Sequence, residues 1–260
     1  MSAALPQPFD VKLMNLTASA LFSACFVLLL VAGAWWALRH PLFAISGITV
    51  QGDVAHNNAV TLRANVAPRL AGNFFTVNLA AARQAFEDVP WVRTAIVRRE
   101  FPNRLRVQLQ EHRAAALWGA ESESRLVNDL GEVFEANPGD VDPEALPRLA
   151  GPDQQSAQVL AMYRAVKPLF EPLELAVQRL ALTAGGNWQL ELETGALIEL
   201  GRGSPEEVTA RAQRFVQTLT QVASRYSRRP EALVSADLRY GDGYAVRLRG
   251  VATTGADAKK

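Results

Sequence analysis

The side chains that most often carry chemistry in proteins are few and scattered in this sequence of 260 residues. The three histidines are His40, His56 and His112, and no pair of them has a spacing typical of metal ligands. Cys25 is the only cysteine and lies inside a long apolar run, so the rest of the chain has neither thiol chemistry nor disulfides. We therefore interpret the histidines as isolated, solvated side chains and expect no metal site.

Two further motifs resemble ligand-binding or catalytic sequences but are better explained as local structure. The run Gly-Arg-Gly-Ser at 201–204 resembles part of a phosphate-binding loop, but no lysine follows at the required offset, and it is not a Gly-x-Ser-x-Gly elbow. Glu206 and Glu207 form a carboxylate pair, yet Ser204 with Glu207 matches a capping box at a helix start. Without a nucleophile, metal set or cofactor loop, the sequence predicts a binding protein that is not an enzyme and needs no cofactor.

An arginine-rich strip is the clearest charged feature of the chain. It lies on two neighbouring predicted strands and comprises Arg93, Arg98, Arg99, Arg104 and Arg106. Two interpretations remain open, a solvated sheet face or a docking surface for an acidic partner or anionic lipid. The formal net charge of the chain is only +1, so no strong positive field indicates a nucleic-acid partner.

A membrane-spanning helix is predicted at 13–38, where 26 consecutive residues carry no charge. As a helix the run is about 39 Å long, more than a hydrocarbon core of about 30 Å requires. The alternative is a cleaved signal, with Ala32-Gly33-Ala34 as the cleavage pattern, but the run is too long for one. The pair Trp35-Trp36 suits the membrane interface of an intact span. Lys12 and Arg39 flank the run almost symmetrically, so charge leaves the orientation undecided.

Residues 43–112 are expected to form a compact α+β unit in the order β-α-α-β-β. Only about four residues separate this unit from the span, so it must sit against the membrane surface. The last strand has a strict period of two, which predicts one buried and one wet face. Its predicted elements are strands at 45–50, 92–99 and 105–109 and helices at 57–66 and 79–86, with a core that includes Ile48, Val50, Val97, Val107 and Leu109.

Residues 113–250 are expected to form a second, β-rich, meander-like domain with two helices. The helices are predicted at 154–169 and 204–226, while 138–151 is predicted as loop and 251–260 as a disordered tail. Predicted strands lie at 114–118, 125–128, 133–134, 176–182, 188–193, 197–200, 233–239 and 244–249. No later segment has strand character, so the strand at 244–249 is expected at a sheet edge.

Several short motifs, in order, resemble the cell division protein FtsQ (DivIB) family. The POTRA module of that family is matched by Pro-Trp-Val-Arg at 90–93, Arg-x-Phe-Pro at 99–102 and the alternating strand that ends at Glu111. Later matches are Leu-Val-Asn at 126–128, Leu-Pro-Arg-Leu-x-Gly-Pro at 146–152, Trp-Gln-Leu at 188–190, Leu-Gly-Arg-Gly at 200–203 and Asp-Leu-Arg-Tyr at 237–240. The chain departs from the family at Leu248, where relatives often carry an aromatic residue.

The resemblance implies a non-enzymatic bitopic scaffold of the bacterial divisome in the cell inner membrane. Residues 1–12 would be cytoplasmic, and the POTRA and β-rich domains would be periplasmic, as in a single-pass type II protein. The protein would bind FtsB and FtsL and link early to late division proteins at the septum, with neither nucleic acid nor a small molecule as ligand. One alternative is a membrane-anchored POTRA chaperone for envelope proteins, which is disfavoured because the sequence shows no POTRA repeat or downstream barrel. Another is an anchored hydrolase, which is disfavoured because the sequence offers no nucleophile, metal set or cofactor loop.

The last strand is the predicted partner-binding site. An exposed edge offers unpaired N–H and C=O groups, so a segment of FtsB is expected to add there as an extra strand. The alternative is that Arg247 and Arg249 only block the edge. The predicted partner-binding residues are Arg202, Tyr240, Gly243, Tyr244, Val246 and Leu248.

Overall fold

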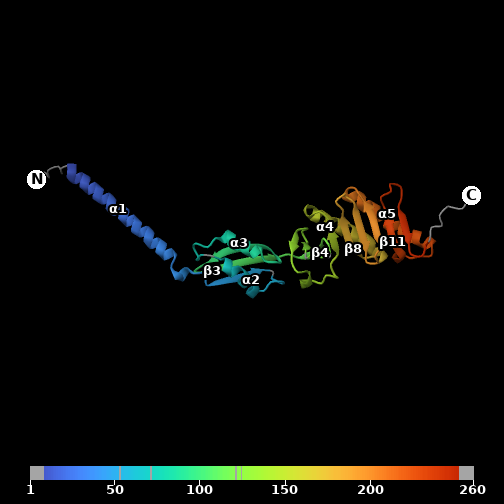
Figure 1. The fold of residues 1–260 in the computed structure, drawn as a ribbon, viewed down its shortest axis with the longest axis horizontal. Helices are drawn as coiled ribbons and strands as arrows, with labels where there is room; N and C mark the ends of the chain where they lie inside the picture. The colour runs from blue at the N-terminus through green and yellow to red at the C-terminus, as the bar shows by residue number, and fades with distance from the viewer. Residues whose placement is uncertain (1–8, 53, 71, 121, 124, 252–260) are drawn as a thin grey trace, which may run out of the picture. The chain divides into compact units, whose positions relative to one another are not determined.

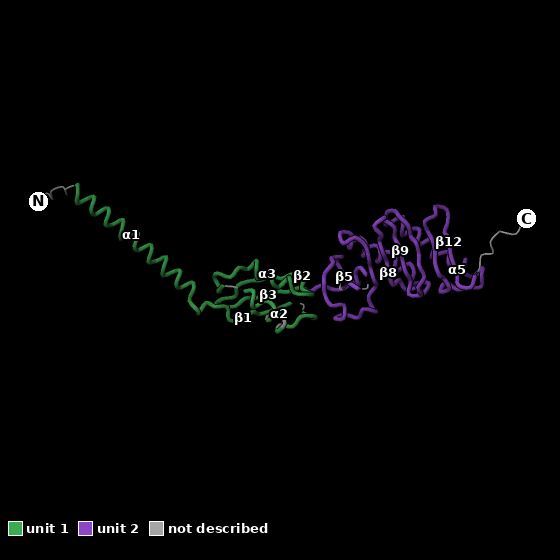
Figure 2. Tube along the Cα trace, viewed as in Figure 1, with its two compact units in different colours: residues 1–110 green, residues 111–260 purple. Residues whose placement is uncertain are grey.

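The structure is a computed structural model that describes residues 9–251 except 53, 71, 121 and 124. The expected tail, apart from residue 251, and most of the expected N-terminal segment therefore lie outside the described residues. The chain divides into two compact units, residues 1–110 and residues 111–260 (Figure 2). The α+β class, with one long N-terminal helix, a POTRA region and a β-rich domain that carries two helices, is confirmed.

The first element is α1, Phe9–Leu38, which has no buried residue and a mean hydropathy of 2.2 over its most apolar window. Its 30 residues extend about 45 Å, which exceeds the thickness of a hydrocarbon core. At its C-terminal end the Arg39 guanidinium lies 4.4 Å from the centre of the Trp35 ring, so a cation–π contact joins the last turn to the residue beyond it. Figure 1 shows α1 as one continuous helix, consistent with a single-pass anchor.

The rest of unit 1 is a three-stranded sheet with two helices. Its elements are β1 Gly47–Gly52, α2 Ala59–Val66, α3 Leu79–Glu87, β2 Val92–Glu100 and β3 Arg104–Glu111, with single 3₁₀ turns at Pro41–Phe43 and Ala67–Arg69. The strand order is β1-β3-β2, and β1 runs parallel to β3. This is the predicted β-α-α-β-β order, with the alternating strand β3 at the centre because it pairs on both sides.

Local sequence explains these elements. The Asn78 side chain caps α3 by accepting hydrogen bonds from the backbone N–H groups of Ala80 and Ala81. Along β3 exposed and buried residues alternate without exception, and the buried set is Leu105, Val107, Leu109 and Glu111. Half-buried side chains that pack against this core include Ile48, Val50 and Val97.

Unit 2 is built on a nine-stranded sheet in the order β12-β11-β10-β9-β8-β7-β4-β5-β6. Its strands are β4 Ala114–Trp118, β5 Arg125–Asn128, β6 Val133–Glu135, β7 Arg148–Ala150, β8 Val177–Leu182, β9 Trp188–Leu192, β10 Leu197–Gly201, β11 Leu233–Asp237 and β12 Ala245–Leu248. Its helices are α4 Ser156–Phe170 and α5 Pro205–Arg225, with short 3₁₀ turns at Pro138–Asp140, Asp153–Gln155, Glu171–Leu173 and Pro230–Ala232.

The sheet differs from the predicted meander in two ways. Strand β7 lies within the segment predicted as loop, because three residues are too few to display a period and its pairing is entirely long-range. The sheet is also mixed: β7 is parallel to β4 and β8, and β10 is parallel to β11. Parallel neighbours require a crossover, which α4 supplies between β7 and β8 and α5 supplies between β10 and β11.

Both helices bury one side against the sheet. In α5 the predicted capping box between Ser204 and Glu207 is present. The sequence predicts a buried stripe of Val208, Phe215, Leu219 and Val222, and the first three are buried. Ala212 and Ala223 complete the observed stripe, whereas Val222 is only half-buried. The largest fully buried side chains of unit 2 are Trp118, Trp188, Phe170 and Phe215, which lie in one continuous core.

We predict that the spanning helix is retained in the mature protein, because its uncharged run is too long for a signal and Trp35-Trp36 suits an interface. N-terminal sequencing of the membrane-bound protein should begin at or near Met1. A mature form that begins at Trp35 would contradict this.

We predict that Val107→Asp unfolds the POTRA unit, since it buries a carboxylate without a partner at a cost of about 3 kcal/mol or more. The matched control is Gln108→Asp, one residue further along β3, where the side chain is exposed and a carboxylate stays hydrated. Thermal unfolding followed by circular dichroism should separate the two variants, and equal melting temperatures would refute the face assignment.

Candidate partner-binding site

Strand β12 forms one end of the nine-stranded sheet and pairs antiparallel with β11. Leu248 lies opposite Leu233 and Ala245 lies opposite Asp237, and the N–H of Arg249 donates to the Ala232 carbonyl at 2.8 Å. Among the described strands none pairs with the outer side of β12. The prediction that this strand lies at a sheet edge is therefore confirmed.

Alternation along β12 separates core contacts from solvent contacts. Tyr244, Val246 and Leu248 face the core, and Leu248 is only 4% exposed. Ala245 and Arg247 are exposed. Leu248 was one of the predicted partner contacts, but its side chain packs in the core of unit 2 and is not available to a partner.

Backbone direction follows from the same alternation. Because the N–H of Arg249 points to β11, the N–H and C=O groups of Arg247 and Ala245 also point to β11, whereas those of Val246 point outward. The N–H of Leu248 is outward too, but its carbonyl accepts a hydrogen bond from Val251 at 3.2 Å. The outward backbone groups of β12 are thus the N–H and C=O of Val246 and the N–H of Leu248.

Tyr244 connects the start of β12 to α5. Its hydroxyl lies 2.5 Å from the Thr218 hydroxyl, and its ring meets the Phe215 ring edge-on, with centroids 5.0 Å apart at 89°. Phe215 is fully buried, so this contact ties the edge strand to the core of unit 2. Tyr240, at the other end of the same loop, is 60% exposed and offers its ring to solvent.

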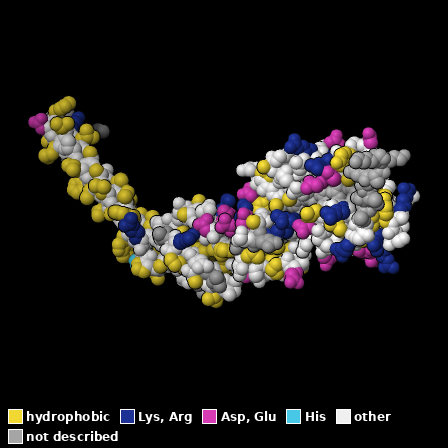
Figure 3. Space-filling model, turned by 45° about the vertical axis from the view of Figure 1, so that its right-hand side comes forward, with side chains coloured by type: hydrophobic (Ala, Val, Ile, Leu, Met, Phe, Trp, Pro, Cys, Tyr) yellow, Lys and Arg dark blue, Asp and Glu magenta, His cyan; other side chains and the backbone are white. Residues whose placement is uncertain are grey.

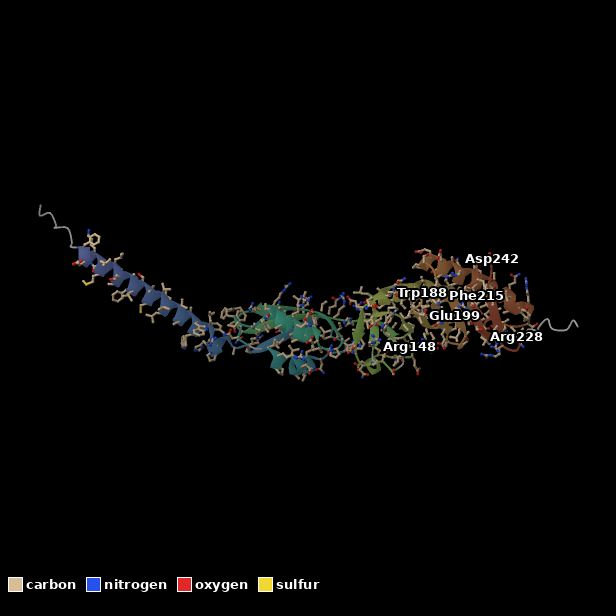
Figure 4. All side chains as sticks on the ribbon, turned by 45° about the horizontal axis from the view of Figure 1, so that its top comes forward. Arg148, Trp188, Glu199, Phe215, Arg228 and Asp242 are labelled. Atoms are coloured by element: carbon tan, nitrogen blue, oxygen red, sulfur yellow. The ribbon has the colours of Figure 1, made fainter. Side chains whose placement is uncertain are left out.

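A cavity of about 230 Å³ lies beside this edge, between α5 and the loop that precedes β12. Its lining includes Arg211, Arg214 and Thr218 from α5 and Leu238 with residues 240–244 from the loop. Phe215, which contacts Tyr244, and the cavity residue Asp242 are both labelled in Figure 4. Arg211 and Arg214 were not predicted as site residues, although their spacing of three places both on one face of a helix.

The cavity lining carries two arginines, Arg211 and Arg214, and one carboxylate, Asp242, so its formal charge is positive. Arg211 donates through Nη2 to the carbonyl of Arg202, whereas its Nε is buried and has no hydrogen-bond partner among the described residues. A buried donor without a partner is costly, and a carboxylate is the acceptor that matches a guanidinium best. The excess of guanidinium over carboxylate groups in the lining therefore favours an acidic group in the cavity.

Arg202 lies just beyond β10, two strands in from the edge. Its side chain is exposed and donates from Nε to the Asn187 Oδ1 atom at 3.2 Å. The structure gathers Tyr240, Gly243 and Tyr244 around the cavity but links Arg202 to it only through the backbone contact with Arg211.

An ion pair holds the chain where it leaves β11. Arg239 donates from Nε and Nη2 to the Asp237 carboxylate, at 2.9 and 2.6 Å. Hydrogen bonds from Arg239 lower the pKa of Asp237, and the same contact raises the pKa of Arg239. Both charges therefore persist at neutral pH and fix the start of the loop that carries Tyr240.

A larger cavity, of about 450 Å³, lies elsewhere in unit 2, between α4 and the start of β8. It is lined by acidic side chains that include Glu144, Glu171, Glu174 and Glu193, with Lys167 among them. Burial, followed by the nearby Glu171, raises the pKa of its Tyr163. This cavity adjoins no free strand edge, so the smaller one is the better candidate for a partner site.

The predicted arginine strip is divided between the two faces of the POTRA sheet. Arg99 is on the helix-facing side with Val97 and donates to the carbonyls of Phe74 at 2.6 Å and Val77 at 2.8 Å. Alternation places Arg93 on that side and Arg98 on the other, together with Arg104 and Arg106 of β3. Arg106 forms an ion pair with Glu100. The five arginines do not form one surface.

Comparison with known proteins covers both units. Residues 43–112 match the model described as "POTRA domain, FtsQ-type", and residues 116–239 match "Cell division protein FtsQ/DivIB, C-terminal". The second match ends before the 240–244 loop and β12.

Several whole-length relatives carry the printed name cell division protein FtsQ. The relative from Thiomonas arsenitoxydans is 39% identical over 96% of this chain and 93% of its own. Those from Burkholderia pseudomallei and Bordetella pertussis are 40% and 37% identical, over 93% and 92% of this chain and 94% and 92% of their own. The chain therefore belongs to the FtsQ/DivIB family of cell division proteins, and it is a non-enzymatic component of the divisome with a single N-terminal membrane-spanning helix.

Proposed function

We propose that this protein is a bitopic scaffold at the division septum that binds FtsB and FtsL and links early to late division proteins. In this proposal α1 crosses the inner membrane, the N-terminus is cytoplasmic, and both folded units are periplasmic. Family membership supports divisome partners in general. The observation that carries the choice of site is the outer edge of β12 beside a cationic cavity.

A segment of FtsB adds to β12 as a further strand. The edge strand has only four residues, and its outward groups allow about three hydrogen bonds, each worth about 1 kcal/mol net. Micromolar affinity requires about 8 kcal/mol. Backbone pairing therefore sets the register of the partner, and side-chain contacts must supply most of the binding free energy.

The cavity supplies those contacts. The exposed Tyr240 ring offers apolar area to the partner, and the two arginines of α5 offer charge to an acidic side chain. Arg211 and Arg214 both line the cavity, so an acidic side chain of the partner that enters it meets two guanidinium groups. Gly243 has no side chain to obstruct a strand that approaches beside it, and Arg202 adds positive charge nearby.

The alternative interpretation of the edge is that the exposed Arg247 and Arg249 only discourage pairing with other chains. The N–H groups of Arg247 and Arg249 both point inward, so the outward N–H groups of Val246 and Leu248 remain open to a partner. This interpretation also assigns no role to the adjacent cavity. The chaperone alternative gains no specific support, because residues 116–239 match an FtsQ-type domain and not a second POTRA domain.

We predict that Arg214→Glu and Tyr240→Ala each weaken capture of the periplasmic segment of FtsB by about tenfold or more, since each removes a contact central to the cavity. The matched control is Arg229→Glu, an exposed arginine beyond the end of α5 that does not line the cavity. Affinity is measured with the full chain in detergent. Unchanged FtsB affinity in both variants, with normal melting temperatures, would exclude this site.

A backbone substitution tests strand addition directly. Val246→Pro removes an outward N–H, so it should reduce FtsB binding about tenfold while lowering the melting temperature less than Arg247→Pro does. Arg247→Pro removes an N–H that points to β11 and should lower the melting temperature. Full binding by Val246→Pro would show that FtsB docks without adding a strand.

A further inference from the structure

One end of the POTRA unit carries apolar side chains exposed to solvent. Leu42 is 72% exposed, Phe75 is 43% exposed and Phe101 is 77% exposed, although none lies in the spanning helix. The Phe43 ring meets Phe75 edge-on at 4.9 Å, and the buried Phe74 ring lies 6.2 Å from that of Phe101. We name Leu42, Phe43, Phe75 and Phe101 the aromatic tip.

The loop that carries Phe75 is held firmly. The Asn73 Oδ1 atom accepts hydrogen bonds from the backbone N–H groups of Phe75 and Thr76, each at 3.0 Å. Arg99 donates to carbonyls on both sides of this turn, and the N–H of Phe74 donates to the carbonyl of Phe43 at 2.8 Å. Because these hydrogen bonds fix the loop, they hold the Phe75 ring in its exposed position.

Chain connectivity places the aromatic tip close to the membrane. Only residues 39–41 separate the end of α1 from Leu42, a reach of about 14 Å at most. Trp35 and Trp36 lie in the last turn of α1, where aromatic side chains favour the interface between hydrocarbon and water. Figure 3 shows hydrophobic side chains along the helix and also on the part of unit 1 that follows the helix.

Sheet topology places Phe101 at the same end. Strand β1 begins at Gly47 and pairs parallel with β3, which begins at Arg104. Phe101 lies in the turn that enters β3, so it occupies the end where β1 starts, nearest to α1 in the chain. The N–H of Ser46 donates to the Asn103 carbonyl at 2.9 Å, which joins these two segments.

We propose that the aromatic tip inserts into the headgroup region of the bilayer that α1 spans, so that the POTRA unit rests on the lipid surface. The occupant is lipid because the tip is tethered within reach of the interface, where aromatic rings are favoured. The inference rests on the span of α1 and goes beyond the proposed partner site, which is on unit 2. It also gives Arg99 a role, since its hydrogen bonds hold Phe75 in the exposed position.

The test uses the full chain in phosphatidylcholine vesicles that contain a lipid with a nitroxide at its headgroup. In a Cys25→Ser background, Phe75→Cys and Phe101→Cys carry a fluorescent label. The control is Val60→Cys, which is 78% exposed and lies on α2, after the far end of β1. We expect the nitroxide to quench labels 75 and 101 about threefold more than label 60. Equal quenching at the three positions would overturn the inference.

A second measurement leaves the tip free of labels. A polar label at Ala44→Cys, an exposed position beside the tip, should be quenched about threefold less when Phe75→Ser and Phe101→Ser are introduced together. The control pair Val54→Ser with Val60→Ser should leave its quenching unchanged, and melting temperatures confirm the fold. An unchanged signal in the Phe75→Ser/Phe101→Ser variant would overturn the inference.

Alkaline carbonate extraction distinguishes the two ways of failing. If the protein is extracted, α1 does not span the bilayer, and the inference fails with it. If the protein resists extraction and labels 75 and 101 are not preferentially quenched, the span stands and only the insertion of the tip is refuted.

Discussion

The parallel pairing of β10 with β11 is the constraint on which the candidate partner site depends. Parallel neighbours cannot be joined by a tight turn, so the chain must cross over the sheet, and α5 provides that crossover. Its buried stripe, from Val208 to Ala223, fixes the helix on the sheet. After β11 the chain reverses through the 240–244 loop into β12, which is therefore the outermost strand. The same loop lies beside α5 and lines the cavity with it.

Some polar clusters in this protein resemble catalytic sites but have a structural role. Trp118 donates from Nε1 to Asp153 at 2.8 Å, and Arg125 pairs with the same carboxylate. The pKa of Asp153 is lowered, first by the hydrogen bond from Trp118 and then by the charge of Arg125. The lowered pKa of Asp153 is thus explained by contacts that join β4, β5 and the turn before α4. A structural role for this cluster agrees with a family that has no enzymatic activity.

The two units differ in the kinds of groups that they expose. Unit 1 joins the spanning helix to a small sheet that has exposed aromatic side chains at one end. Unit 2 holds the larger core and the edge strand β12, which has outward backbone groups and a cavity lined by arginines beside it.

Local patterns in the sequence were sufficient for much of this fold. The uncharged run defines α1, the strict alternation defines β3, and the capping box at Ser204 defines the start of α5, because each is an interaction among neighbours in the chain. The position of β12 at an edge also followed, since no later segment has strand character.

Tertiary structure decided what depends on distant residues. Strand β7 exists only through pairing with β4 and β8, and Leu248 is a core residue because β12 lies over the buried side of α5. The arginine strip separates because alternate residues of a strand face opposite sides, and the Arg211 cavity forms only when α5 meets the 240–244 loop. Such contacts are set by packing between segments far apart in the chain, and a local pattern carries no record of them.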